Sequence, residues 1–210
     1  MNQLVGTDFS SPPWLRIGND KSKGSGEFGG STLRMAAAAG RGVTNVMQRC
    51  ESAKVTGYLD LSDCGLMYVA DAIYLVLKDF SIDKCNLRNN VLTKFPKKMV
   101  NKFENMLVLN LEGNQIEEIP NEIAEWSTMR GLNIANNKLT SFPEALYSLK
   151  QLTFLDISGN EISDIDVEQL YTSLPGLAQL TVSKTQLSTT QIEELEKNSK
   201  KPPKMRLNFV

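Results

Sequence analysis

The chain contains no histidine, which removes many of the familiar routes to nucleophilic or zinc chemistry. Serine and cysteine nucleophiles are usually activated by a neighbouring imidazole, and many zinc sites include one. Carboxylates remain, such as the pairs Glu117-Glu118 and Glu193-Glu194, which fall in a predicted turn and a predicted terminal helix. Acidic residues in such places generally keep a surface solvated. We therefore expect a protein that is not an enzyme and has no cofactor or metal.

One short motif, Gly24-Ser25-Gly26-Glu27-Phe28-Gly29, matches a nucleotide-binding pattern. A glycine loop that cradles phosphates needs a strand before it and a helix directly after it, and these flanks predict neither. We interpret the motif as linker and expect residues 1–42, where Ser, Gly and Pro cluster, to form a disordered extension. Because Met35 precedes four alanines, as at an ordinary translation start, we expect the residues before it to be an upstream extension.

The dominant pattern in the rest of the chain is a recurring phrase of apolar residues. Its copies begin at Thr56, Ile82, Met106, Met129, Leu152 and Leu177. A period of roughly 25 residues is typical of leucine-rich repeats and is shorter than that of helical-hairpin or propeller repeats. The predicted fold is therefore α/β, a leucine-rich repeat solenoid with a curved parallel sheet and a short helical or irregular convex side.

Each position of the phrase has a structural interpretation. Positions four and six are apolar in nearly every copy, as at Leu109 and Leu111, and should point into a shared core. The alternation around them predicts one short strand per repeat, paired in parallel with the next. Position nine is asparagine in four successive copies, namely Asn90, Asn114, Asn137 and Asn160. Because a buried amide can satisfy backbone groups at the turn, we assign these four residues to the scaffold.

Helices are expected to cover both ends of the stack. An N-terminal cap helix over 43–54 is indicated by apolar residues at helical spacing, Val43, Val46, Met47, Cys50 and Ala53. A C-terminal cap helix over about 189–199 is indicated by the capping-box pair Ser188 and Gln191, with Ile192 and Leu195 buried. Residues 205–209 should add an edge strand. The repeat domain is thus expected to span 43–210, with six repeats from Thr56.

The composition of the chain indicates which class of partner and which cellular compartment to expect. With 210 residues and a formal net charge of −1, the chain has no overall bias toward nucleic acid, which is not expected as a partner. No stretch has the roughly 20 apolar residues of a membrane span, and the N-terminus lacks a signal-peptide pattern. The odd number of cysteines, at Cys50, Cys64 and Cys85, indicates free thiols in a reducing compartment. We expect a cytoplasmic monomer, with the nucleus as an alternative location.

The positions that the phrase leaves free define the predicted binding surface. Positions three, five and seven should form the concave face, where function on this architecture usually lies. The residues expected to contact a protein partner are Tyr58, Asp60, Lys84, Asn86, Arg88, Val108, Asn110, Glu112, Asn133, Phe154, Asp156 and Thr181. Of these, Tyr58, Val108 and Phe154 are expected to be exposed anchors beside the small Gly131 and Ala135. The alternative is that this face is simply covered by solvent, since single exposed apolar residues are common.

A rival surface is the basic segment near the C-terminus. Its cations are Lys197, Lys200, Lys201, Lys204 and Arg206. Such a run could dock acidic partners or lipid headgroups and make the protein a membrane-associated adaptor. The acidic residues Glu193, Glu194 and Glu196 lie just upstream and favour a solvated loop instead.

The repeats at 109–114 and 155–160, with the sequences Leu-Asn-Leu-Glu-Gly-Asn and Leu-Asp-Ile-Ser-Gly-Asn, resemble those of short intracellular leucine-rich repeat proteins. The resemblance covers about 43–210. It implies a protein-binding scaffold or regulator and offers no catalytic residue to transfer. Because the class includes phosphatase-binding subunits, a regulatory subunit of an enzyme such as a phosphatase is a further alternative, supported by the shared fold alone.

Overall fold

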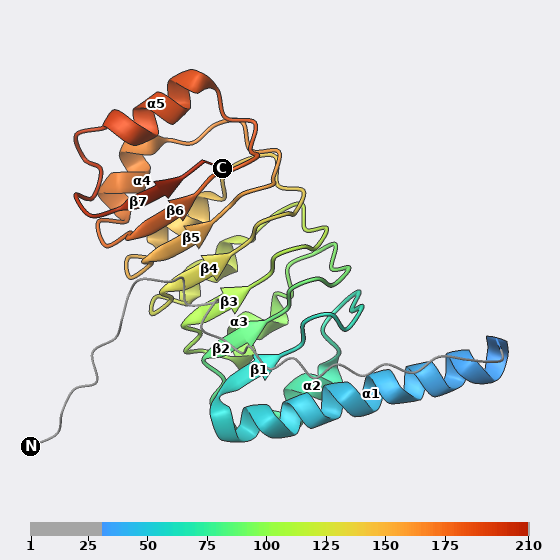
Figure 1. Cartoon of the computed structure of the whole chain (residues 1–210). Coiled ribbons are helices and arrows are strands. Elements are labelled where there is room, and N and C mark those ends of the chain that lie inside the picture. Colours follow the sequence, from blue (N-terminus) through green and yellow to red (C-terminus); the bar gives the residue numbers. More distant parts are fainter. Residues whose placement is uncertain (1–30, 210) are drawn as a thin grey trace, which may run out of the picture.

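The computed structural model describes residues 31–209, so the predictions for 1–30, including the glycine motif, lie outside the described part. Seven short parallel strands form one sheet whose order follows the sequence (Figure 1). The strands are β1 (Tyr58–Asp60), β2 (Lys84–Asn86), β3 (Val108–Asn110), β4 (Gly131–Asn133), β5 (Phe154–Asp156), β6 (Gln179–Thr181) and β7 (Arg206–Asn208). Each occupies positions three to five of its repeat, and neighbours pair in register, as Leu109 does with Leu132. The predicted solenoid sheet is confirmed.

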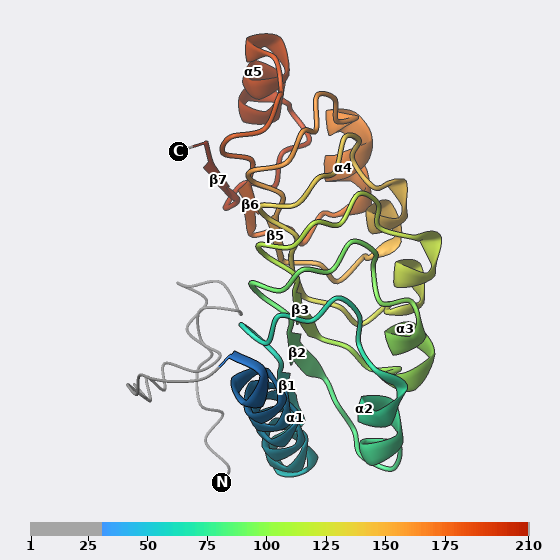
Figure 2. The same ribbon diagram turned by 90° about the vertical axis from the view of Figure 1, so that its right-hand side faces the viewer.

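The segments that return from one strand to the next between β1 and β6 lie on one side of the sheet and contain only short helices (Figure 2). They are α2 (Asp71–Val76), α3 (Lys98–Lys102), η2 (Asn121–Glu125), η3 (Glu144–Ser148) and α4 (Val167–Ser173). Pro120 and Pro143 directly precede η2 and η3. Proline suits that place because its φ is already near the helical value and its missing N–H would have no partner. The convex layer is thin, as the sequence predicts.

The hydrophobic core lies between the sheet and these short helices. Leu109 and Leu111 are fully buried and belong to the sheet side of the core. Trp126 follows η2 and is also fully buried. Its indole Nε1 donates a hydrogen bond to the carbonyl oxygen of Phe103 at 2.7 Å, and its ring centroid lies 6.0 Å from that of Phe95. Residues from adjacent repeats therefore interlock on the convex side.

Asparagine side chains at position nine join each repeat to the preceding one. The Nδ2 of Asn137 donates to the carbonyl oxygens of Leu111 at 3.0 Å, Ile134 at 3.0 Å and Ala135 at 3.1 Å. Its Oδ1 accepts from the backbone N–H of Ile116 at 3.0 Å. Equivalent bonds occur at Asn90, Asn114 and Asn160. These amides satisfy backbone groups that the turn would leave buried, which confirms their scaffold role.

Position eight of each of the six full repeats lies in the left-handed region of backbone conformation. The residues are Asp63, Asn89, Gly113, Asn136, Gly159 and Lys184, with φ between 53° and 68°. Glycine, asparagine and aspartate adopt this conformation at low cost, whereas Lys184 is an exception. Each of these residues lies three positions after the end of its strand, where the chain turns away from the sheet.

Helices lie at both ends of the sheet. Helix α1 (Ser31–Thr56) packs against β1, and α5 (Thr189–Lys197) lies at the other end beside α4 (Figure 1). The expectation of disorder through residue 42 is therefore wrong for 31–42, because the alanine run after Met35 has high helix propensity. Val43 is 66% exposed rather than buried, since α1 extends beyond the edge of the repeats there (Figure 1).

The start of α5 follows the expected capping pattern in part. The hydroxyl oxygen of Ser188 accepts from the backbone N–H of Gln191 at 3.2 Å. The reciprocal half of the capping box is replaced, because the Gln191 side chain donates to the Asp164 carboxylate and the Ile165 carbonyl oxygen. These bonds tie α5 to the preceding repeat. Leu195 on the same helix is fully buried.

The three cysteines are free thiols at buried or partly buried positions. Burial raises the pKa of Cys50, Cys64 and Cys85 above the usual thiol value. Because the thiolate is the reactive form, these side chains are poor nucleophiles at neutral pH. Within residues 31–209, no helix combines the length and apolar character that crossing a membrane requires.

Candidate functional site on the concave face

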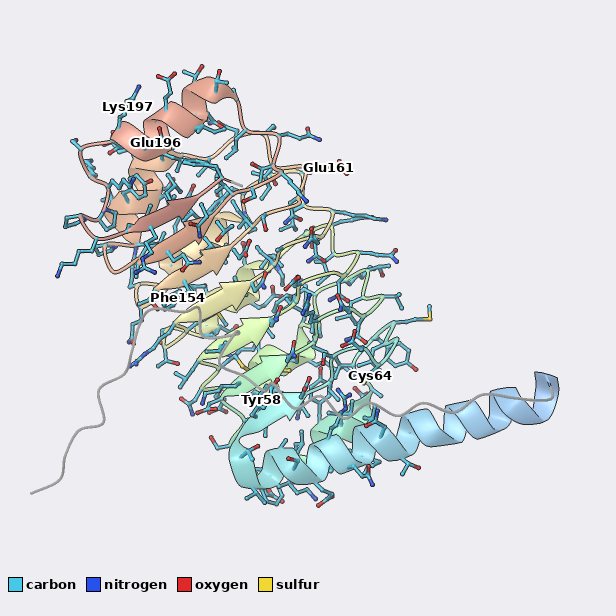
Figure 3. The ribbon with its side chains drawn as sticks, viewed as in Figure 1. Tyr58, Cys64, Phe154, Glu161, Glu196 and Lys197 are labelled. Atoms are coloured by element: carbon cyan, nitrogen blue, oxygen red, sulfur yellow. The ribbon has the colours of Figure 1, made fainter. Side chains whose placement is uncertain are left out.

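The predicted contact residues lie on the face of the sheet opposite the core. Side chains at position four, such as Leu132, belong to the core cluster, whereas those at positions three and five, such as Phe154 and Asn133, do not. All twelve lie in β1 to β6 or two residues beyond a strand. Figure 3 shows Tyr58 on β1 and Phe154 on β5. The register therefore gathers them on one face, and their contact with a partner stays a prediction.

The fifth column has a structural role that sequence reasoning missed. The Oδ1 of Asn133 accepts from the backbone N–H of Ala135 at 3.0 Å, and the Oδ1 of Asp156 accepts from that of Ser158 at 3.0 Å. The same bond occurs at Asp60, Asn86 and Asn110. A side-chain oxygen that accepts from the N–H two residues on forms an Asx turn. The turn thus dictates Asp or Asn here, and only the second oxygen or the NH₂ group is left for a partner.

At the β1 edge, a residue outside the repeats joins the concave face. Arg49 of α1 donates through Nη1 to the carbonyl oxygens of Asp60 at 3.1 Å and Ser62 at 2.9 Å. The same nitrogen lies 3.6 Å from the Asp60 carboxylate. That carboxylate also accepts from Asn86 Nδ2 at 3.1 Å. The negative charge of Asp60 is therefore balanced by Arg49 within the protein. The repeat pattern carried no signal for Arg49, which precedes the first repeat.

A second network connects the following strands. The Nη2 of Arg88 lies 3.2 Å from the Oε1 of Glu112, and the Oε2 of Glu112 accepts from Asn133 Nδ2 at 3.1 Å. The Arg88 side chain keeps 49% of its surface exposed. Arg88 and Glu112 therefore pair with each other, although Arg88 remains accessible to another molecule, and Lys84 on β2 has no carboxylate within 4.0 Å among the described residues.

Asp156 on β5 differs from Asp60 because it has no basic partner among the described residues. Its Oδ1 accepts from the Ser158 N–H at 3.0 Å and from the Ser158 hydroxyl at 2.6 Å. Burial raises the pKa of this carboxyl, and the bonds from Ser158 only partly oppose that effect. A partly desolvated carboxylate without a cation is unfavourable. Asp156 is thus well placed to gain from a cation that another molecule supplies.

Tyr58 presents a second unsatisfied group at the β1 end of the face. Its buried hydroxyl lies close to the side chains of Asn86 and Asp60 but forms no hydrogen bond of good geometry within the described residues. Burial raises the pKa of the phenol, so the hydroxyl remains a neutral donor at physiological pH. A buried donor without an acceptor is costly, and an acceptor from a bound molecule would remove that cost.

Two of the three expected anchors are less exposed than predicted. Val108 is 5% exposed and Phe154 is 3% exposed, and Gly131 between them is also buried. The alternation along a strand indicates the face on which a side chain lies, but it does not give the fraction of that side chain that stays exposed.

Two of the five cations in the basic C-terminal segment are paired with carboxylates. The Nζ of Lys197 lies 3.0 Å from the Glu193 carboxylate, and the Nζ of Lys200 lies 2.6 Å from that of Glu168. Figure 3 also places Glu196 beside Lys197 on α5. These carboxylates reduce the local positive charge and so weaken the case for lipid or acidic partners at this site. No group of three His, Cys, Asp or Glu side chains among residues 31–209 could hold a metal ion.

Replacing Asp156 with asparagine should stabilise the protein at neutral pH. Asparagine keeps the acceptor for Ser158, as Asn133 does for Ala135, and removes the desolvated charge. Because the pKa of Asp156 is raised in the fold, the folded state binds more protons than the unfolded state between the two pKa values. The stability contributed by the wild-type side chain therefore falls as pH rises through that interval.

We expect Asp156→Asn to add at most about 1 kcal/mol to the free energy of unfolding at pH 7. The difference should vanish near pH 3, at about which the carboxyl is protonated in both states. Urea unfolding of both proteins at the two pH values measures this. The same difference at both pH values would contradict the assignment.

The chain resembles known leucine-rich repeat proteins. The sequence model of the family described as Leucine Rich repeats (2 copies) matches residues 127–169. Leucine-rich repeat-containing protein 20 of Mus musculus is 36% identical over 93 residues, which cover 43% of this chain and 50% of the relative. The Homo sapiens protein of that name is 33% identical over the same shares. The chain thus spans about half the length of the curated relatives it matches.

A solved structure of a leucine-rich repeat protein from Leptospira interrogans has the same fold. It superposes with a TM-score of 0.58 at 24% sequence identity, over 68% of this chain and 34% of that one. At this level of identity, the likeness shows the fold alone.

Proposed function

We propose that this leucine-rich repeat protein, which resembles leucine-rich repeat-containing protein 20 over part of its length, binds another protein on the concave face of its sheet. Leucine-rich repeat solenoids are in general protein-interaction modules, because the stacked repeats form an extended concave surface. In this chain the side chains at positions three and five line that surface in register from β1 to β7. The residues on this face indicate which chemical groups the surface of the partner presents.

The uncompensated carboxylate of Asp156 is the observation that carries this proposal. A lysine or arginine side chain of a partner would pair with it, and a hydrogen bond to a charged group contributes about 1.5–3 kcal/mol. The Tyr58 hydroxyl would donate to an acceptor on the same partner. Four strand spacings separate β1 from β5, so the partner must span about 19 Å. We therefore infer a partner surface with a basic side chain near β5 and a hydrogen-bond acceptor near β1.

The test is a double variant that removes only these two contacts, Asp156→Asn with Tyr58→Phe. Affinity capture from a cell extract, followed by titration with each purified candidate, should show Kd increased about tenfold or more, the loss expected for one charge-assisted bond. The matched control carries the same chemical changes away from the concave face, at the exposed Asp79 (Asp79→Asn) and the buried Tyr147 (Tyr147→Phe). Partners that bind the wild type and both variants equally would refute the proposal. Circular dichroism melts would show that each variant is folded.

A further inference from the structure

A groove on the convex side of the protein lies outside the concave face. One hollow of about 640 Å³ is bounded by Met67, Tyr68 and Lys94, and another of about 480 Å³ lies between α2 and α3 beside Leu75 and Lys102. The two hollows share the lining residues Asp71, Tyr74 and Lys98 and therefore adjoin one another at the Asp71–Lys98 ion pair. We refer to these two adjoining hollows as the α2–α3 groove. Figure 2 shows α2 and α3 on the side of the sheet that carries the short helices.

Large apolar side chains are exposed along the α2–α3 groove. Met67 is 73% exposed, and Tyr68 and Leu75 are each 72% exposed. Single exposed apolar residues are common, but three of them around one depression indicate a contact site. Tyrosine and methionine are also enriched where proteins meet. The groove therefore presents apolar side chains that water covers in the isolated chain.

The charge of the α2–α3 groove is positive. Lys78, Lys94 and Lys102 line it and have no carboxylate within 4.0 Å among the described residues. The carboxylate of Asp71 is already paired with Lys98 at 2.7 Å. Unpaired cations on both walls of a depression attract carboxylates and suppress binding of basic segments.

The positive region has a boundary on the side of the third repeat. A hollow that adjoins the groove at Lys94 and Lys97 is lined also by Glu117 and Glu118, which lower the positive charge there. Lys97 there is paired with Glu122 at 3.1 Å. An acidic ligand is therefore favoured along α2 and α3 and is repelled farther along the stack.

We propose that the α2–α3 groove binds an acidic segment of a partner protein in which apolar side chains alternate with carboxylates. The three unpaired lysines receive the carboxylates, while Met67, Tyr68 and Leu75 cover the apolar side chains. The indented shape favours a chain over a lipid surface, because a membrane-binding face must present its apolar side chains to a flat layer. This site lies on the opposite side of the sheet from Asp156, and it does not depend on the function proposed for the concave face.

The probe is a fluorescein-labelled peptide of Glu-Glu-Leu repeats, titrated with the full chain and followed by fluorescence anisotropy at low ionic strength. Lys78→Glu with Lys102→Glu should raise Kd about tenfold, which corresponds to about 1.4 kcal/mol. Met67→Ser with Tyr68→Ser should also weaken binding, because it removes the apolar contacts. A matched charge reversal elsewhere, Lys138→Glu with Lys204→Glu, should leave Kd unchanged. All six side chains are exposed, so the variants should fold.

Two further peptides separate charge from apolar contact. Peptides of Gln-Gln-Leu repeats and of Glu-Glu-Ser repeats should each bind more weakly than the Glu-Glu-Leu probe. Equal binding of all three peptides, or an equal loss in the matched control variant, would overturn the proposal. So would failure of the wild type to bind the probe, or binding only to vesicles of phosphatidylserine and phosphatidylcholine, since the latter result assigns the groove to lipid.

Discussion

Asn137→Ala should lower the free energy of unfolding by about 3–4 kcal/mol, because it removes a buried amide that forms four hydrogen bonds. The N–H of Ile116 in the preceding repeat would lose its acceptor in a place that water does not reach, whereas the carbonyl oxygen of Leu111 would keep the bond from Asn114 Nδ2 at 2.9 Å. The destabilisation is large because four bonds are lost and the unpaired N–H stays buried, whereas a mutation that removed both partners would cost much less.

Urea denaturation followed by circular dichroism measures this effect. Because repeats of a solenoid contact only their neighbours, a weakened junction at Asn137 should also lower the m-value or split the transition as the two parts of the stack separate. The matched control is Asn101→Ala, at an exposed position in α3, where a change within about 0.5 kcal/mol is expected. A loss below about 1 kcal/mol at Asn137 would show that the turn satisfies its backbone groups without the amide.

Trp126→Ala should cost about 3–5 kcal/mol, because the side chain is fully buried and its removal leaves a cavity on the convex side of the core. The substitution also removes the only side-chain donor that reaches the carbonyl oxygen of Phe103 among the described residues. The ring of Phe95 would lose its aromatic neighbour. This site tests whether the thin convex layer contributes to stability as the sheet does.

The measurement is again urea unfolding, and two controls separate the causes. Trp126→Phe retains an aromatic ring but not the Nε1 donor, so it should cost about 1–3 kcal/mol. Leu75→Ala removes an apolar side chain from the same convex layer where it is exposed, so a change within about 0.5 kcal/mol is expected. A Trp126→Ala protein as stable as the Leu75→Ala protein would contradict this account of the convex core.

The repeat pattern predicted the architecture well because each of its constraints repeats along the chain. Leu109 and Leu132 occupy the same position in successive repeats, and the register of β3 and β4 follows from that alone. The role of Asn137 could be predicted from the chemistry of an amide at a buried turn. Features that occur once in the chain were harder to predict, because no second copy strengthens their signal. The helix that begins at Ser31 and the reach of Arg49 to Asp60 are of this kind.

The sequence predicted which face of the sheet carries the candidate site, but not how exposed its side chains are or how its charges are paired. Alternation placed Phe154 and Asp156 on the concave side, yet it gave no indication that Phe154 is only 3% exposed. Asp60 and Asp156 look alike in sequence, since each precedes a serine by two residues. They differ because Arg49 reaches only the first of them. The α2–α3 groove was missed because it forms between residues outside the repeated columns.

The hydrogen bonds of the position-nine asparagines indicate which end of the stack of repeats unfolds first. The side-chain Oδ1 of Asn90 in the second repeat accepts from the backbone N–H groups of Cys64 and Leu66 in the first repeat. These bonds join the N-terminal repeat to its neighbour. In the last full repeat the corresponding residue is Thr185, whose hydroxyl donates to Val182 of its own repeat at 2.8 Å. Among the described residues, that repeat has no position-nine amide bonded to its neighbour, and it is held by sheet pairing, core contacts and the bonds of Gln191 to Asp164 and Ile165. Local unfolding should therefore begin at the C-terminal end and stop at Asn160, the last position-nine asparagine whose side chain bonds to the preceding repeat.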